Sequence, residues 1–311
     1  MASWTTTDLP DFSGRRVIIT GGNSGLGLEC ARALAARGAK LTLACRDLGK
    51  ARAAQESLRQ EAPAADIELL ELDLADLSSV RKAADHYHGR ESQLHLLLNN
   101  AGVMAIPRRQ TADGFEMQLG TNHLGHFAFT SLLCDLLLGT KGSRVVNVSS
   151  TAHKMGQMRW DDLQWERSYG KWTAYAQSKL ANLLFTYELQ RRLAARGSEV
   201  LAVAAHPGYA ATNLQLAGAR MRNSSAGERL WRGINSLFSQ SAEMGALPLL
   251  RAAGGAGVAG GDYYGPERLA ESRGHPVKVG SSGRARDQAD AARLWKLSEQ
   301  LTGQRFETLD A

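Results

Sequence analysis

Three glycines that interrupt an apolar, β-branched run constrain the fold of this 311-residue chain more than any other feature. The stretch from Val17 to Gly27 reads Val-Ile-Ile-Thr-Gly-Gly-Asn-Ser-Gly-Leu-Gly, and helix-forming residues follow at 28–37. This order predicts a strand, a tight turn and a helix whose N-terminus faces an anion. Gly21 then permits the turn, Gly25 lets the backbone approach a pyrophosphate, and Gly27 lets the helix pack against the strand. The stretch therefore indicates a phosphate cradle.

Glycines alone are weak evidence, because they also mark ordinary turns. Their spacing here, Gly-x-x-x-Gly-x-Gly after Thr20, differs from Gly-x-Gly-x-x-Gly, and no Gly-Lys-Ser/Thr string follows. The stretch therefore does not fit a Walker A site for a nucleoside triphosphate. The helical pattern stops at Gly38, which is typical of a helix C-terminus, and a second strand pattern begins directly afterwards.

Strand and helix patterns alternate from about residue 15 to about residue 210 without a polar linker, which favours one large α/β domain. Buried strands are expected at 17–20, 40–44, 67–72, 94–98, 144–150, 200–205 and 262–264. These seven strands predict a doubly wound, mostly parallel sheet flanked by helices, in a single domain over residues 1–311. Residues 15–210 would form the cofactor-binding and catalytic core, and the less regular stretch 213–245 a substrate lid.

The composition predicts a soluble, cytoplasmic protein. Hydrophobic residues make up 43% of the chain, yet its apolar runs are too short to span a membrane, and the N-terminus shows no signal-peptide pattern. The net charge of +6 comes from scattered arginines, so neither nucleic acid nor an anionic membrane is an expected partner. Cys30, Cys45 and Cys134 lack Cys-x-x-Cys spacing and fit reduced, buried thiols.

The end of the second strand bears on the choice of cofactor. In a dinucleotide-binding fold, an acidic side chain at this strand end accepts hydrogen bonds from the ribose hydroxyls of NAD(H). An arginine at the same place can instead bind the 2′-phosphate of NADP(H). Arg46 therefore favours NADP(H), unless it pairs with the adjacent Asp47 on the surface. After the third strand, Asp73 and Asp76 are both candidates to cap the helix expected at 77–88.

The histidines offer no metal site in this pattern. His86 and His88 are two residues apart on an expected helix and face different ways. His123 and His126 share a helix face, but no third ligand has a suitable spacing. We interpret these two as helix-packing or surface residues, and no metal is expected.

Two further patterns can carry acid–base chemistry. Tyr175 and Lys179 are four residues apart on an expected helix, so their side chains lie on one face. A cation beside a phenol favours the phenolate and lowers a pKa that starts near ~10. Ser149 and Ser150 end the fifth strand, where alternation lets only one of them face the cleft. An exposed Tyr/Lys pair and turn-capping serines are the structural alternatives.

Taken in chain order, these strings resemble the classical short-chain dehydrogenase/reductase family. The resemblance covers about two thirds of the chain and rests on Thr20 to Gly27, Asn-Asn-Ala-Gly at 99–102, Asn122, Val-Ser-Ser at 148–150, Tyr175 with Lys179, and Pro207-Gly208. Four strings are similar to the retinol-dehydrogenase-like branch: Ala-Cys-Arg at 44–46, Asn-His-Leu-Gly-His-Phe at 122–127, Val-Ser-Ser-x-Ala-His at 148–153 and Ser-Lys-Leu-Ala-Asn at 178–182.

The resemblance implies a Rossmann fold and hydride transfer between nicotinamide and a carbonyl or alcohol carbon. It makes Ser150 the residue that positions the substrate oxygen and Tyr175 the general acid and base. It has Lys179 lower the tyrosine pKa and bind the nicotinamide ribose, while Asn122 bends its helix and completes a proton relay through its carbonyl. The residues implied in cofactor binding are Gly21, Asn23, Ser24, Gly25, Leu26, Gly27, Arg46, Asp73, Leu74, Asn100, Ala101, Gly102, Tyr175, Lys179, Pro207, Gly208 and Thr212.

The predicted function is therefore an NADP(H)-dependent oxidoreductase of a lipophilic aldehyde, ketone or alcohol. A catalytically idle module that senses NADPH is the alternative, which the complete Ser-Tyr-Lys set disfavours. The glycine spacing disfavours an epimerase or dehydratase of the family's extended branch.

Two structural questions stay open at this stage. Helices at 124–138 and 180–193 resemble those that pair subunits in the family and suggest a homo-oligomer, but burial within one subunit would explain the same apolar pattern. Trp160, Trp165 and Trp172 lie in a long stretch before Tyr175, where they either wall the substrate cleft or anchor the insertion.

Overall fold

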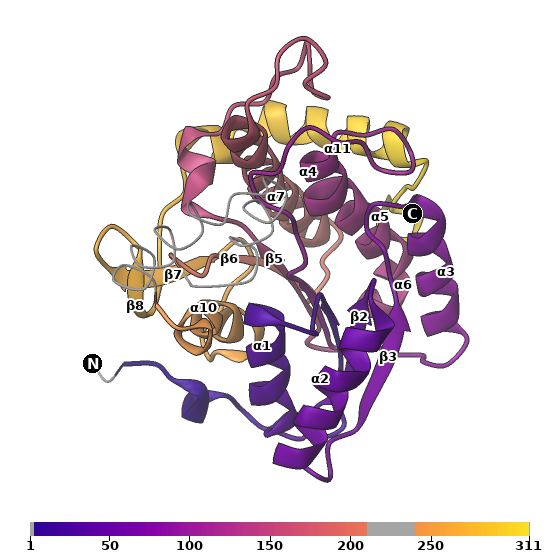
Figure 1. Cartoon of the computed structure of the whole chain (residues 1–311), viewed down its shortest axis with the longest axis vertical. Coiled ribbons are helices and arrows are strands. Elements are labelled where there is room, and N and C mark those ends of the chain that lie inside the picture. Colours follow the sequence, from indigo (N-terminus) through magenta and orange to yellow (C-terminus); the bar gives the residue numbers. More distant parts are fainter. Residues whose placement is uncertain (1–2, 210–239, 311) are drawn as a thin grey trace, which may run out of the picture.

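A computed structural model of the chain describes residues 3–209 and 240–310. Its core is one sheet in the order β3-β2-β1-β4-β5-β6-β7-β8, with helices on both faces (Figure 1). The predicted doubly wound α/β fold is confirmed. Because the strand order reverses between β1 and β4, a ligand crevice is expected there, at the carboxyl ends of the strands. Thr212 and all but the last residues of the expected lid at 213–245 lie outside the described residues.

The sheet has eight strands, one more than the seven expected. Neighbours from β3 to β7 pair in parallel, and β8 is antiparallel to β7. The pattern of β8 was missed because it contains Gly274 and Pro276, which are unusual in strands; an edge strand tolerates the proline, which cannot donate to a ladder. The strands are β1 Arg16–Thr20, β2 Lys40–Cys45, β3 Ile67–Glu71, β4 Leu96–Asn99, β5 Arg144–Val148, β6 Leu201–Ala205, β7 Tyr263–Arg268 and β8 Arg273–Lys278.

Side chains that alternate along the strands bury two apolar layers. Val17 and Ile19 of β1 pack with the helices on one face, whereas Ile18 packs with those on the other. The first face carries α1 Gly25–Ala35, α2 Leu48–Glu61 and α10 Ala242–Gly254. The second carries α3 Leu77–His88, α5 Gly125–Leu132, α6 Cys134–Leu138, α7 Lys171–Ala195, α11 Gln288–Thr302 and α12 Glu307–Asp310. Cys30, Cys45 and Cys134 are free and buried, as expected.

The long helix expected over 118–138, which the resemblance has Asn122 bend, is divided into shorter pieces. It begins as α4 Met117–Leu119, widens into a π-helical turn at Gly120–Leu124, and continues as α5 and α6. The break before α6 falls at Leu133, and the preceding Leu132 carbonyl lies 2.9 Å from His88 Nε2, which gives it a side-chain partner. Such π turns are frequent at functional sites, and this one contains Asn122.

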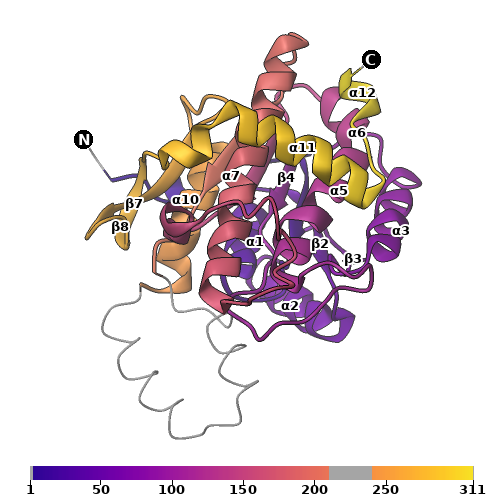
Figure 2. The ribbon, with the colours of Figure 1, turned by 90° about the horizontal axis from the view of Figure 1, so that it is seen from above.

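The C-terminal helices cover the helices that the resemblance associates with subunit pairing. In Figure 2, α11 lies across α7 and α5, and its more extensive contact is with α7. Trp295 and Phe306 complete an aromatic cluster with Phe127 and Phe185. In this chain the apolar pattern at 124–138 and 180–193 thus reflects burial within one subunit. Among the described residues, no helix has the length and apolar character needed to cross a membrane.

Candidate active site

The glycine turn between β1 and α1 forms the predicted cradle. Gly21 and Gly25 have φ angles of 66° and 54°, a region that favours glycine. A Cβ on Gly27 would lie 2.4 Å from the Gly21 carbonyl oxygen, so the close helix–strand packing requires glycine. Ser24 is the N-cap of α1, but its side chain makes no capping hydrogen bond that would compete with an anion. The cradle, with partly exposed residues 23–26, fits a dinucleotide pyrophosphate.

Thr20 joins this cradle to the loop that follows β4. Its hydroxyl oxygen accepts the backbone N–H groups of Asn100 and Ala101, each at 2.9 Å. The side-chain amide of Asn100 donates to the Thr20 carbonyl, also at 2.9 Å. A Cβ on Gly102 would lie 2.8 Å from Asn122 Oδ1. The Asn-Asn-Ala-Gly string therefore lies between the glycine turn and Asn122, and glycine at 102 permits the close approach.

Arg46 follows β2 directly, and 74% of its side chain is exposed. Asp47, the partner that could have neutralised it, instead accepts the Lys50 backbone N–H at 3.0 Å and pairs with the Lys50 ammonium at 2.9 Å. The only ion pair recorded for Arg46 among the described residues is a long one, 3.8 Å from Nη1 to Asp73 Oδ2. The guanidinium thus lies just after the carboxyl end of β2 and is largely solvated.

Asp76, rather than Asp73, caps α3 by accepting two backbone N–H groups of its first turn. Asp73 accepts the Ala75 N–H at 3.0 Å, and its side chain is about one-third exposed, at 35%. Leu74 is buried, and its backbone carbonyl would come within 2.4 Å of a Cβ on Gly125. Of the two residues predicted at this strand end, Asp73 is the more accessible to a ligand.

The two serines after β5 have different surroundings, as the strand alternation predicts. Ser149 is buried and donates to the Lys179 carbonyl oxygen at 2.8 Å. Ser150 caps the short helix Thr151–Met155 and lies close enough to Tyr175 for its hydroxyl to lower the pKa of the phenol. Ser150, not Ser149, is therefore the serine placed beside the tyrosine.

Tyr175 and Lys179 are both buried on one face of α7, with Lys179 Nζ 5.7 Å from the tyrosine ring centroid. Burial raises the pKa of Tyr175 to about 12, and the Ser150 hydroxyl opposes this rise. Burial also lowers the pKa of Lys179 to about 8. The tyrosine pKa thus moves upward rather than downward, because desolvation disfavours the charged form of both groups.

Lys179 is expected to destabilise the fold, because its ammonium is buried and, among the described residues, has one recorded acceptor, the Val148 carbonyl at 3.0 Å. Its pKa of about 8 lies below the ordinary 10.5, so the cost is full below pH 8 and disappears as pH rises towards 10.5. Lys179→Met should therefore raise the free energy of unfolding by about 2 kcal/mol at pH 7 and abolish activity.

The measurement is denaturant unfolding of both proteins at pH 7, 8.5 and 10, where the gap should narrow as pH rises. Val148 keeps a hydrogen bond in the variant, since Asn182 Nδ2 also donates to its carbonyl at 3.0 Å. The exposed Lys50, replaced by methionine in the same way, should show no such gain. A lower free energy of unfolding for Lys179→Met than for wild type at pH 7 would contradict the prediction that burial of the Lys179 ammonium destabilises the fold.

Asn122 lies in the π-helical turn, with its side chain fully hydrogen-bonded. Its Oδ1 accepts the Val103 N–H at 2.8 Å, while Nδ2 donates to the Val103 carbonyl and to Ser178 Oγ, both at 2.9 Å. Its backbone carbonyl lies 3.0 Å from His126 Nδ1. The sequence reading missed this contact, although the i, i+4 spacing of Asn122 and His126 was a signal for it.

Pro207 and Gly208 follow β6 at the same end of the sheet. Gly208 has a φ of 66°, and a Cβ there would come within 2.4 Å of the Ser272 carbonyl oxygen. Gln240 Nε2 donates to the Pro207 carbonyl at 2.7 Å. The turn is thus held against the β7–β8 hairpin, at the carboxyl edge of the sheet where the resemblance expects it.

The three tryptophans divide between the two roles that the sequence left open. Trp160 donates from Nε1 to Asp290 Oδ1 at 3.0 Å, and Trp165 is buried under the Arg159 guanidinium. These two anchor the insertion. Trp172 is 50% exposed, with its ring centroid 6.4 Å from that of Tyr175. Among these three, only Trp172 lies next to Tyr175.

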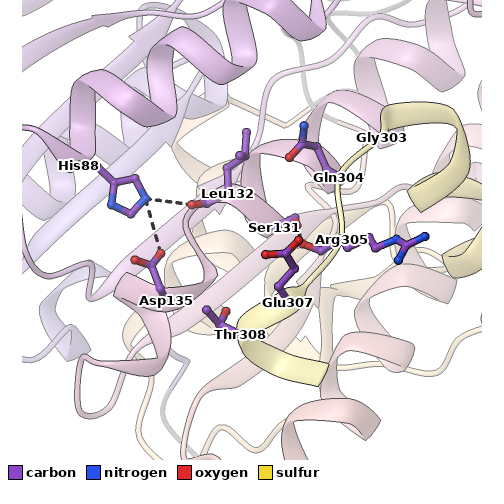
Figure 3. Close-up of a pocket in the computed structure, with 9 residues that line it drawn as sticks. All are labelled: His88, Ser131, Leu132, Asp135, Gly303, Gln304, Arg305, Glu307 and Thr308. Carbon is purple, nitrogen blue, oxygen red and sulfur yellow. Dashed lines mark hydrogen bonds and ion pairs between the residues drawn. The ribbon is translucent and has the colours of Figure 1, made fainter. Parts of the chain in front are cut away.

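A separate surface hollow lies between α3, α6 and the C-terminus (Figure 3). His88 points into it, with Nε2 3.5 Å from Asp135 Oδ1. None of the residues predicted to bind cofactor or substrate lines this hollow. The lining residues are His88, Ser131, Leu132, Asp135, Gly303, Gln304, Arg305, Glu307 and Thr308.

Comparison with known proteins identifies the family of the chain. The sequence model of the short chain dehydrogenase family matches residues 15–222. Human retinol dehydrogenase 12 is 42% identical over 97% of this chain and 90% of its own length, and human retinol dehydrogenase 13 is 41% identical over 93% and 85%. A crystal structure of an uncharacterised protein from Mycobacterium paratuberculosis superposes with a TM-score of 0.81, at 46% identity over 98% of this chain and 99% of that one.

The fold, the glycine cradle and these matches define an oxidoreductase that binds a nicotinamide cofactor: the chain belongs to the short-chain dehydrogenase/reductase family. Within that family it falls in the retinol-dehydrogenase-like branch, with relatives at about 40% identity over nearly its whole length. Members of the family act on small molecules, and the candidate site lies where such a substrate would meet the cofactor.

Proposed function

We propose that this protein is an NADP(H)-dependent oxidoreductase that interconverts a lipophilic alcohol and its carbonyl compound through Ser150, Tyr175, Lys179 and Asn122. One observation carries the proposal: a buried Tyr175 lies beside Ser150 and one helical turn from a buried Lys179, with Lys179 Nζ 5.7 Å from the tyrosine ring centroid. A structural tyrosine would not need a serine partner and a buried lysine on the same face. The bound cofactor supplies the hydride acceptor or donor.

Each side chain has a separate task in this reaction. The Ser150 hydroxyl orients the substrate oxygen and stabilises charge that develops on it. Tyr175 gives its proton to that oxygen in carbonyl reduction and takes it back in alcohol oxidation. Lys179, when charged, favours the phenolate that remains after the proton has left. Asn122 is held beside Lys179 and carries the relay that returns a proton from solvent.

Arg46 supports the preference for NADP(H), because its guanidinium is exposed and Asp47 is engaged by Lys50. Arg46→Asp should weaken NADPH binding about tenfold or more, since a charge-assisted hydrogen bond to phosphate is lost and a like charge is added. NADH binding should stay the same or improve. Fluorescence titration with both cofactors measures this, and Arg52→Asp, at an exposed position of α2, controls for net charge. Equal weakening in both variants would contradict a specific role of Arg46.

The surface around the tyrosine supports a lipophilic substrate. The large hydrophobic side chains that are exposed in the described part of the chain are Met155, Trp172, Tyr209 and Leu269. Trp172 lies beside Tyr175, and Met155 ends the short helix that Ser150 begins. An apolar surface at the mouth of a polar site favours a substrate with an apolar body, as the names of the retinol dehydrogenase relatives suggest.

The test is absorbance of reduced nicotinamide with a panel of lipophilic aldehydes and ketones, after titration with NADPH and NADH. Turnover with NADPH that improves with chain length of the substrate supports the proposal. Tight NADPH binding with no turnover on any substrate would favour the idle, NADPH-sensing module instead.

A further inference from the structure

His126 is buried on α5 and takes no part in the mechanism described so far. Its two ring nitrogens nevertheless contact both halves of the site. Nε2 lies 2.9 Å from the Thr20 hydroxyl, which holds the loop after β4, and Nδ1 lies 3.0 Å from the Asn122 carbonyl oxygen. The imidazole therefore bridges the cofactor cradle and the relay asparagine.

The hydrogen-bond partners determine which nitrogen carries the proton. A carbonyl oxygen can only accept, so the contact with Asn122 requires a proton on Nδ1. The Thr20 hydroxyl oxygen already accepts two backbone N–H groups, from Asn100 and Ala101, and its own proton is free to donate. Its distance to His126 Nε2 is 2.9 Å, against 3.4 Å to the Leu98 carbonyl. The neutral ring with its proton on Nδ1 satisfies every one of these contacts.

The neutral form is also the one that burial selects. Burial lowers the pKa of His126 to about 4, and the positive charge of Lys179 acts in the same direction. The imidazole therefore keeps one donor and one acceptor across the pH range in which the enzyme would work. A fixed tautomer gives the chain of hydrogen bonds a fixed direction, from Thr20 through His126 to Asn122.

We propose that His126 is a positioning residue that holds the Asn122 carbonyl in place and links it to the cofactor-binding loop through Thr20. This inference rests on the proposed function, because the orientation of the Asn122 carbonyl affects catalysis only if the proton relay passes through that carbonyl. The Asn122 side chain is already held by Val103 and Ser178. His126 supplies the contact at the backbone oxygen, the atom to which the relay role is assigned.

His123 shows what a purely structural histidine on the same stretch looks like. It is equally buried, with Nε2 2.8 Å from Ser298 Oγ and its ring among Phe127 and Phe185. Its Nδ1 has no recorded partner among the described residues. None of these contacts is with a residue of the cradle or of the proposed catalytic set, so His123 is a matched control.

Two substitutions of His126 test the hydrogen bonds of Nδ1 and Nε2 one at a time. The amide nitrogen of asparagine can occupy the place of Nδ1, whereas that of glutamine reaches the place of Nε2. His126→Asn therefore keeps a donor for the Asn122 carbonyl, and His126→Gln keeps a partner for Thr20 only. We expect kcat to fall about tenfold in His126→Gln, the usual effect of one lost hydrogen bond, and to stay within about threefold of wild type in His126→Asn. Substrate KM and NADPH affinity should change little in either variant.

The thermal unfolding midpoint of each His126 variant, compared with that of His123→Gln, shows whether a lower kcat results only from a loss of folded structure. We expect His123→Gln to lower the midpoint without lowering kcat of the folded enzyme. Equal losses of kcat in both His126 variants, or losses that follow the midpoint as in His123→Gln, would overturn the proposal.

A second measurement reports on His126 without any substrate. In ¹⁵N-histidine NMR spectra, with the signal assigned by its absence from His126→Asn, wild type should show a protonated Nδ1 and an unprotonated Nε2 from pH 6 to pH 9. A proton on Nε2 would overturn the inference whatever the activity. An enzyme that turns over no substrate but shows the expected tautomer would count against the proposed function and leave the hydrogen-bond chain intact.

Discussion

Replacing Tyr175 by phenylalanine is expected to lower kcat by about 10²- to 10⁴-fold, the contribution usual for a positioned general acid or base. The change removes one hydroxyl and keeps the ring, which is buried and packs edge-on against Trp172. Ser150 keeps its role as the cap of the short helix Thr151–Met155. The fold and cofactor affinity should therefore change little, and the loss should appear in kcat.

The pH dependence of the wild-type enzyme has a definite sign. Because burial raises the pKa of Tyr175 to about 12, the phenol stays protonated below that pH. Carbonyl reduction uses the protonated form, so titration of Tyr175 should not lower its rate between pH 6 and 9. Alcohol oxidation needs the phenolate and should speed up as pH rises.

Steady-state kinetics in both directions, with NADPH titrations of each variant, measure these effects. Tyr187→Phe is the matched control, because Tyr187 lies on the same helix and its hydroxyl contacts Ser281 at 2.9 Å, away from the site. Turnover by Tyr175→Phe within tenfold of wild type would show that another group transfers the proton.

The sequence predicted the glycine turn between β1 and α1 well because its constraints are local. A turn that needs positive φ at Gly21 and Gly25, and a helix that tolerates no Cβ at Gly27, can be filled by little else than glycine. Strand alternation indicated that only one of Ser149 and Ser150 faces the cleft, and the family resemblance favoured Ser150, which lies beside the tyrosine.

Features that depend on distant segments were not accessible from the pattern. Arg46 makes its long ion pair with Asp73, which follows a different strand. His126 was interpreted as a helix-packing or surface residue. It is buried, and its contact with Thr20 forms only in the folded chain. The raised pKa of Tyr175 was also missed, because i, i+4 spacing indicates that Lys179 is near but does not indicate that the tyrosine is buried.

Phe306→Ala is expected to produce the largest loss of stability, about 3–5 kcal/mol. Phe306 is completely buried, with ring centroids 4.5 Å from Trp295 and 5.2 Å from Phe127. Truncation would leave a cavity in the aromatic cluster that joins the C-terminal segment to α5 and α7. In a chain of this size the thermal midpoint should fall by about 10 °C.

The same variant tests the inference that α11 and α12 cover these helices within one subunit. Loosening the cover exposes apolar surface of α5 and α7, and exposed surface of this kind promotes association. Light scattering at increasing concentration should therefore show more self-association for Phe306→Ala than for wild type or for Lys296→Ala, a control at an exposed position of α11. An unchanged midpoint and unchanged association would mean that the C-terminal segment adds little to the core, and that the apolar faces of α5 and α7 are satisfied by the sheet alone.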